Sequence, residues 1–299
     1  MKNIYEQLQH FGKTDYNVPL SSMTTLRIGG NARYVCYPDD VVSLDGIIRL
    51  LDKEGIPYKV FGRGSNMLCS DDDYEGAIIR LDRGFDRYYF NDDHLIAYAG
   101  CSIIHLAYES MKNELSGLEF ASGIPGTVGG LTFMNAGAYK SCMKDIVERV
   151  MVYRNGTTEW INADDCGFAY RHSIFHEHPD WIILAADMKL EHKDDNEIRE
   201  VIESRKARRM ATQPLDKPSA GSVFRNPDEI PAWQLIEGIG YRGRQVGGAK
   251  VSEKHVNFIV NENRASATDF MTLVDEITKK VMEQYGIELH MEVEKFNWR

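Results

Sequence analysis

A ten-residue segment, Ala121-Ser122-Gly123-Ile124-Pro125-Gly126-Thr127-Val128-Gly129-Gly130, holds four glycines and one proline. The run Asn135-Ala136-Gly137-Ala138 follows it after a short apolar stretch. Because glycine has no side chain, segments of this kind let another group approach the backbone closely. A convoluted surface loop would explain the glycines, but not their repeated pairing with apolar residues. The segment therefore favours a binding loop for a flat or extended ligand.

A second glycine-rich turn, Gly62-Arg63-Gly64-Ser65-Asn66, directly follows a predicted strand at 58–61. Its backbone N–H groups could converge on an anion, and Ser65 and Asn66 add side-chain donors. Alone, the pattern is as typical of a plain β-turn. Two such loops in one domain favour a ligand the size of a dinucleotide. The sequence has no GxxxxGK[ST] loop, and Met67 replaces the third glycine of a GxGxxG fingerprint.

Strand and helix patterns surround these loops. Short β-branched or aromatic runs predict strands at 32–37, 58–61, 76–81, 95–99, 146–154, 157–161 and 181–190. Helical periodicity predicts helices at 41–53 and 103–115, after a short helix and lead-in within residues 1–20. From residue 195 the sequence predicts a helix with a basic end at 205–209, a helix ending before Gly286, and a strand at 287–296. This order predicts an α+β fold in two parts.

Composition limits the possible partners. The 299 residues carry 35 Lys and Arg against 45 Asp and Glu, a net charge of −10. A surface of that sign repels phosphate backbones and anionic lipid, so neither nucleic acid nor a membrane is expected as a partner. The five cysteines form no CxxC pair, which favours reduced, buried thiols. The N-terminus has no signal-peptide pattern, and we expect a cytoplasmic protein.

Seven motifs, read in order, resemble one family over nearly the whole chain. Besides the three glycine-rich runs quoted above, they are Thr25-Leu26-Arg27-Ile28-Gly29-Gly30, Tyr170-Arg171-His172-Ser173-Ile174-Phe175, Ala220-Gly221-Ser222-Val223-Phe224-Arg225-Asn226-Pro227 and Glu292-Val293. Together they resemble the UDP-N-acetylenolpyruvoylglucosamine reductase (MurB) family. Ser222 follows Arg171 by 51 positions, which is similar to the short form of that family.

The resemblance implies both an architecture and an activity. After an N-terminal lead-in at 1–28, it implies an FAD-binding domain at 29–195, of the vanillyl-alcohol oxidase and p-cresol methylhydroxylase (PCMH) type. A smaller α/β substrate-binding domain would follow at 196–299. The implied reaction is the NADPH-dependent, FAD-mediated reduction of UDP-N-acetylglucosamine enolpyruvate to UDP-N-acetylmuramate in peptidoglycan precursor synthesis. FAD would be bound non-covalently by a monomeric enzyme whose partner is this small nucleotide sugar, and no metal is expected.

The implied reaction gives roles to three residues. Hydride addition to a double bond conjugated to a carboxylate needs stabilisation of the developing negative charge and a proton donor. By resemblance, Ser222 is the proton donor, and Arg171 and Glu292 stabilise the enolate-like intermediate. Glu294, on the same face of the predicted strand, is a neighbour of Glu292 or an alternative to it. Without the family, a serine between glycine and valine is more typical of a turn hydroxyl.

The resemblance also implies two sets of binding residues. Contacts with FAD are expected at Arg27, Gly62, Arg63, Gly64, Ser65, Asn66, Ser122, Ile124, Pro125, Gly126, Val128, Gly129, Gly130, Asn135, Ala136 and Gly137. Contacts with the substrate are expected at Tyr170, Gln213, Arg225 and Asn226, where Arg225 could meet the diphosphate.

Two other functions remain open from the residues. One is a flavoprotein oxidase of the same superfamily, which would use oxygen and would have no need for Ser222, Arg171 and Glu292. The other is a nucleotide-sugar-binding protein that has lost its flavin and its catalytic activity. Recolouring of the reduced flavin only by air would favour the first, and a colourless protein that binds a UDP-sugar would favour the second.

Overall fold

The computed structural model describes residues 3–298, which form two compact, interleaved units. Unit 1 contains the N-terminal residues through Tyr16, Tyr34–Arg63 and Gly76–Ala207. Unit 2 contains Asn17–Arg33, Gly64–Glu75 and the residues from Arg208 onward. The domain boundaries expected at 28 and 195 divide the chain into consecutive segments and stay a prediction.

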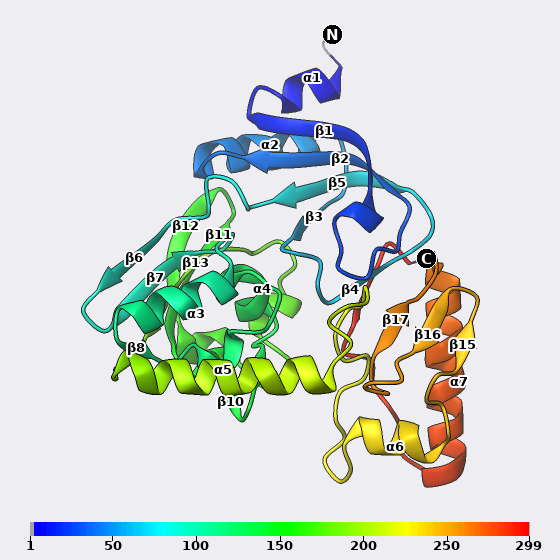
Figure 1. Cartoon of the computed structure of the whole chain (residues 1–299). Coiled ribbons are helices and arrows are strands. Elements are labelled where there is room, and N and C mark those ends of the chain that lie inside the picture. The colour runs from blue at the N-terminus through cyan, green and yellow to red at the C-terminus, as the bar shows by residue number, and fades with distance from the viewer. Residues whose placement is uncertain (1–2, 299) are drawn as a thin grey trace. The chain divides into compact units, whose positions relative to one another are not determined.

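A four-stranded sheet is formed by strands from the first 80 residues (Figure 1). Its order is β1 (Gly12–Pro19), β2 (Asn31–Pro38), β5 (Tyr74–Arg80) and β3 (Tyr58–Phe61). Helices α1 (Ile4–Leu8) and α2 (Val41–Lys53) belong to the same part of the chain. Helix α2 begins at a capping box, in which Asp40 accepts a 2.8 Å hydrogen bond from the Ser43 N–H.

A five-stranded antiparallel sheet forms the rest of unit 1. Its order is β12 (Thr157–Asn162), β11 (Val147–Arg154), β13 (Ile182–Lys189), β7 (His94–Tyr98) and β6 (Tyr88–Asn91). Helix α4 (Val128–Phe133) packs on β13 and β7. Helices α3 (Ile103–Lys112) and α5 (Asp195–Thr212) share a small apolar cluster, and α5 ends beyond the limit of unit 1.

Short elements connect these layers in unit 1. They are the pairs β8 (Leu115–Ser116) with β14 (Glu191–His192) and β9 (Gly137–Ala138) with β10 (Ser141–Cys142), and the 3-10 helices η2 (Glu119–Ala121), η3 (Met143–Asp145), η4 (Ala163–Cys166) and η5 (Ile174–His176).

Unit 2 is built around the long helix α7 (Ala267–Tyr285). Ser266 caps its start and Gly286 ends it in the left-handed region, with a φ of 67°. The other elements are η1 (Leu20–Ser22), α6 (Ala232–Gly238), an antiparallel sheet of β15 (Gln245–Val246), β16 (Ala249–Val251) and β17 (Ile259–Asn261), and a parallel pair of β4 (Met67–Cys69) with β18 (Glu294–Phe296).

Each unit has its own hydrophobic core. The core of unit 1 includes the fully buried Phe85, Phe120 and Phe175, and that of unit 2 includes Phe224 and Phe270. Truncation of such a phenylalanine to alanine costs about 3–5 kcal/mol, so each of these side chains contributes strongly to the stability of its core. Among the residues that the structure describes, no helix combines the length and apolarity needed to cross a membrane.

The structure confirms most predicted elements and corrects two. The helix at 41–53 and the strand at 58–61 have the predicted bounds. The strand predicted at 287–296 is wrong, because regular pairing is confined to Glu294–Phe296. Within the predicted lead-in, β1 was not foreseen. As predicted, the five cysteines are free thiols, four of them buried, and burial raises the pKa of Cys101 to about 11.

Candidate functional site

The two glycine-rich loops meet in unit 1. A Cβ atom placed on Gly62 would lie 2.8 Å from the Thr127 hydroxyl oxygen, and one on Gly129 would lie 2.9 Å from the Ala99 Cβ. The N–H groups of Gly129 and Val128 donate to the carbonyls of Ala99 and Cys101, at 2.9 and 3.0 Å. The two hydrogen bonds attach the loop at 122–130 to the end of β7. Neither Gly62 nor Gly129 has room for a side chain, so both positions require glycine.

The first loop keeps backbone donors available. Within the described chain, the N–H groups of Arg63, Gly64 and Ser65 donate no hydrogen bond, and neither does the Ser65 hydroxyl. Gly64 has a φ of 61°, which is the left-handed region that favours glycine. Consecutive free N–H groups at such a turn suit an anion, so this donor set fits the diphosphate of FAD.

Arg171 lies at the tip of a tight turn in unit 1. Ala169 and His172 exchange two backbone hydrogen bonds, of 3.1 and 3.2 Å, around Tyr170 and Arg171. Arg171 has a φ of 53°, its Nη2 donates to the Gly137 carbonyl at 3.0 Å, and its guanidinium lies 5.0 Å from the Tyr170 ring centroid. The arginine is therefore presented in one defined conformation, beside a tyrosine ring that is 53% exposed.

The segments that carry Ser222 and Glu292 are paired in unit 2. The chain around Ser222 runs antiparallel to residues 290–292, with an isolated bridge between Phe224 and Met291. The Glu292 N–H donates to the Val223 carbonyl at 2.8 Å, and the Arg225 N–H donates to the His290 carbonyl at 2.9 Å. No hydrogen bond to the rest of the described chain occupies the Ser222 hydroxyl. The two predicted catalytic residues thus share one backbone ladder.

Asn257 supports this ladder, and sequence reasoning missed it. Its side chain accepts from the Phe224 N–H at 3.0 Å and donates to the Phe224 carbonyl at 2.9 Å, while its carbonyl accepts from Val223. The side chain is buried, so both amide ends are used where water cannot replace them. The Asn257 N–H in turn donates to His255 Nδ1, and burial lowers the pKa of that imidazole.

Two predicted cofactor contacts lie in unit 2, and one of them, Asn66, bonds to the same ladder. The Asn66 side chain donates to the Glu292 carbonyl at 3.0 Å, and its own carbonyl accepts from Glu294 at 2.9 Å. Arg27 has a φ of 58°, and its carbonyl accepts from Asn261 at 3.2 Å. Gly64, Ser65, Asn66 and Arg27 therefore belong to unit 2 with Ser222 and Glu292.

The other predicted cofactor contacts lie in unit 1. The Ser122 hydroxyl donates to the Glu119 carbonyl at 2.9 Å, and Asn135 uses both ends of its amide within the protein. The Ala136 N–H donates to the Leu131 carbonyl, and the Ala136 carbonyl accepts from the Met143 N–H. Because these side chains bond within the protein, any contact of these residues with a cofactor would be made chiefly by their backbone.

The predicted substrate contacts differ in how they are occupied. Nε of Arg225 and Oε1 of Gln213 are buried and have no hydrogen-bond partner among the described residues. Asn226 is exposed, but its side chain accepts from the Ala232 N–H at 3.1 Å, at the start of α6. Because buried polar atoms without partners are rare, the unpartnered atoms of Arg225 and Gln213 are suited to bind a ligand.

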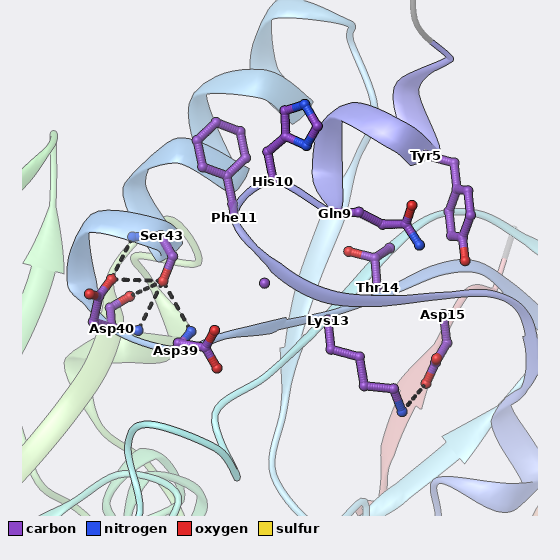
Figure 2. Close-up of a pocket in the computed structure, with 11 residues that line it drawn as sticks. Tyr5, Gln9, His10, Phe11, Lys13, Thr14, Asp15, Asp39, Asp40 and Ser43 are labelled. Carbon is purple, nitrogen blue, oxygen red and sulfur yellow. Dashed lines mark hydrogen bonds and ion pairs between the residues drawn. The ribbon is translucent and has the colours of Figure 1, made fainter.

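An open pocket of about 700 Å³ lies elsewhere in unit 1, where α1, β1 and the start of α2 meet (Figure 2). Lys13 and Asp15 form a 2.9 Å ion pair at its edge, and Ser43 bonds with Asp40 at the helix cap. It contains none of the predicted site residues.

Comparison with known proteins assigns the chain to a family. Residues 32–162 match the family described as FAD binding domain, and residues 213–296 match the C-terminal domain of UDP-N-acetylenolpyruvoylglucosamine reductase. The reductases named so from Bacillus subtilis and Bacillus velezensis are 40% and 39% identical over 297 residues, covering 98% of each chain. The crystal structure of UDP-N-acetylenolpyruvylglucosamine reductase (MurB) from Thermus caldophilus has a TM-score of 0.82 and 33% identity, covering 95% of this chain and 99% of that one.

These findings confirm the predicted fold class, an α+β chain with an FAD-binding domain followed by a MurB-type C-terminal domain. They also confirm that the protein is an oxidoreductase. The chain belongs to the UDP-N-acetylenolpyruvoylglucosamine reductase (MurB) family.

Proposed function

We propose that the protein reduces UDP-N-acetylglucosamine enolpyruvate to UDP-N-acetylmuramate, with NADPH as the hydride donor, in the cytoplasmic synthesis of peptidoglycan precursors. The observation that carries this proposal is the ladder in unit 2, which pairs the segment of Ser222 with that of Glu292. It places Glu292 opposite Val223, the neighbour of Ser222, whose hydroxyl has no hydrogen-bond partner in the described chain. Relatives that cover 98% of the chain carry the name of this reductase.

The residues of the two loops would hold FAD. The unused N–H groups of Arg63, Gly64 and Ser65 would meet its diphosphate, and the loop at 122–130 would lie against it. When bound, FAD would supply the hydride that NADPH provides. The roles of the loop residues follow from donors and shape, and no covalent attachment is needed.

The chain's own residues would manage the proton and the charge. A hydride and a proton add across the carbon–carbon double bond, and the negative charge develops on the conjugated carboxylate. The Ser222 hydroxyl would give its proton to the carbon next to that carboxylate. Arg171 and Glu292 would stabilise the charge, the first through a planar guanidinium matched to a carboxylate. Arg225 and Gln213 would bind polar groups of the nucleotide sugar with their unpartnered atoms.

An anaerobic titration of the purified protein tests this proposal. NADPH should bleach the visible flavin absorbance, and one equivalent of the enolpyruvyl substrate should restore it without oxygen. Recovery only on admission of air would indicate the oxidase instead. A colourless protein that takes up no FAD, yet binds a UDP-sugar, would indicate the non-catalytic binding protein.

A further inference from the structure

We propose that Asn135 is a positioning residue for Arg171, in addition to any backbone contact that it makes with a cofactor. The inference rests on the proposed function, because it assumes that Arg171 acts on the substrate. It adds a residue whose side chain does not need to touch substrate or cofactor and yet controls the placement of the guanidinium.

The turn that carries Arg171 needs support from outside. A non-glycine residue in the left-handed region is unfavourable by itself, and Arg171 has a φ of 53° at the tip of a two-residue turn. The two bonds between Ala169 and His172 close this turn but do not attach it to the sheet or to α4. Such strained conformations persist where surrounding contacts hold them.

One segment, residues 133–137 at the end of α4, provides such support. The Phe133 carbonyl accepts from the Ser173 hydroxyl at 2.5 Å, on one flank of the turn. The Asn135 Nδ2 donates to the Ala169 carbonyl at 2.8 Å, on the other flank. The Gly137 carbonyl accepts from Arg171 Nη2 at 3.0 Å, at the guanidinium itself. Three alternate residues of the segment therefore hold both flanks and the head group.

Asn135 suits the central place because an amide offers both a donor and an acceptor. Its Oδ1 accepts from the Lys144 N–H at 2.9 Å while its Nδ2 holds Ala169, and its exposed fraction is 4%. Its own φ of 41° lies in the left-handed region, which asparagine tolerates better than most residues. An aspartate here would keep the bond from Lys144 but would face the Ala169 carbonyl with a second acceptor.

Two variants separate these contributions. Asn135→Asp replaces the donor to Ala169 with a charged acceptor and keeps the acceptor for Lys144, and Asn135→Gly removes the side chain while keeping a backbone that tolerates the positive φ. Asn155→Gly is the matched control, because Asn155 is an exposed asparagine with a φ of 52° in the same unit. FAD affinity is measured by flavin fluorescence, and the rate of substrate reduction is measured in single turnovers with the enolpyruvyl substrate.

We expect both Asn135 variants to lower the limiting single-turnover rate by about 10-fold to 100-fold, since a misplacement of about 1 Å has effects of that order. FAD affinity and the affinity for substrate should change by less than about threefold, as for the Asn155 control. In an Arg171→Ala background, Asn135→Asp should cause no further loss, because its effect passes through Arg171. A large loss of FAD affinity, or losses that multiply in the double variant, would overturn the proposal.

Hydrogen exchange of the amides at 169–173 provides a readout that does not depend on activity. Exchange there should become faster in Asn135→Asp than in the wild type and in Asn155→Gly. If exchange is faster but Arg171→Ala reduces substrate at the normal rate, the assumed role of Arg171 fails while the support of the turn stands. If exchange is unchanged, Asn135 does not position the turn, whatever the activity shows.

Discussion

The two units hold their candidate catalytic residues in different ways. In unit 1, Arg171 lies in a left-handed turn that is held largely by side-chain hydrogen bonds from Asn135 and Ser173. In unit 2, Ser222 and Glu292 lie on extended segments held by backbone hydrogen bonds, with Asn257 as a clamp. A side-chain support can be removed by one substitution, whereas a backbone ladder survives most changes of its own side chains.

The largest effect is expected for the hydroxyl of Ser222, the proposed proton donor in the unit 2 ladder. Ser222→Ala should lower the rate of substrate reduction by about 10²-fold to 10⁴-fold, because it removes the proton donor and leaves the backbone bonds in place. Reduction of the flavin by NADPH should continue. Single-turnover absorbance changes measure both steps, and Ser204→Ala, at an exposed position of α5, is the control. An unchanged rate of substrate reduction in Ser222→Ala would remove this serine from the mechanism.

A smaller effect, on the free energy of unfolding, is expected for Asn257, the residue that clamps the ladder. Asn257→Asp keeps the acceptor for the Phe224 N–H but places a charged oxygen against the Phe224 carbonyl in a buried site. The free energy of unfolding should fall by about 2 kcal/mol or more, because a buried group is left without a partner. Urea unfolding measures this loss. Asn263→Asp, at an exposed position of unit 2, should leave the free energy nearly unchanged, and equal losses in the two variants would contradict the clamp.

The two units should also respond to pH in opposite directions. In unit 1, a hydrogen bond to Asp187 raises the pKa of His94 above its ordinary value of 6.5. The stability from this pair is present below that value and is lost as the pH rises through the folded-state pKa. We expect His94→Gln to cost at most about 1 kcal/mol at about pH 5.5, and less at about pH 8. Urea unfolding at both pH values measures it, and a cost that grows with pH would contradict the assignment.

The weakest expected effect concerns His255 in unit 2. Burial lowers its pKa below 6.5, so its contribution is present above that value and is lost as the pH falls through the folded-state pKa. The difference in free energy of unfolding between the wild type and His255→Gln should therefore shrink from about pH 8 to about pH 5.5. The same urea series measures it. Parallel trends for the His94 and His255 variants would show that the two imidazoles are not in contrasting environments.

Local sequence patterns predicted a helix or strand correctly where the residues that stabilise it lie within it or directly beside it in the sequence. Helix α2 was predicted with its bounds because its apolar face lies within the helix and its capping residue, Asp40, directly precedes it. The segment 287–293 looked like a strand because Ile287, Leu289 and Val293 alternate with polar residues. Its pairing partner lies near Phe224 and forms only an isolated bridge, which no local pattern shows. Strand β1 escaped prediction because it is mostly polar and exposed.

The sequence proposed the residue types of the candidate site, but it did not indicate the residues that support them. The family resemblance proposed Ser222 and Glu292, and the structure places their segments side by side. Nothing in the sequence marks Asn257, because its supporting role depends on hydrogen bonds to Phe224, which lies 33 positions away. Asn66 was expected at the cofactor, yet its side chain bonds to the Glu292 carbonyl across 226 positions. Contacts at such separations depend on the completed fold, which short motifs do not encode.

The pairing of β4 with β18 has a consequence for how the protein is made. Residues 67–69 leave the ribosome long before their partner, residues 294–296, is synthesised. Most of unit 1 is available by residue 207, whereas unit 2 must wait for the C-terminal segment that also carries Glu292. Because contacts between distant parts of a chain form slowly, a truncated or stalled chain would have a nearly complete unit 1 and no Ser222–Glu292 ladder.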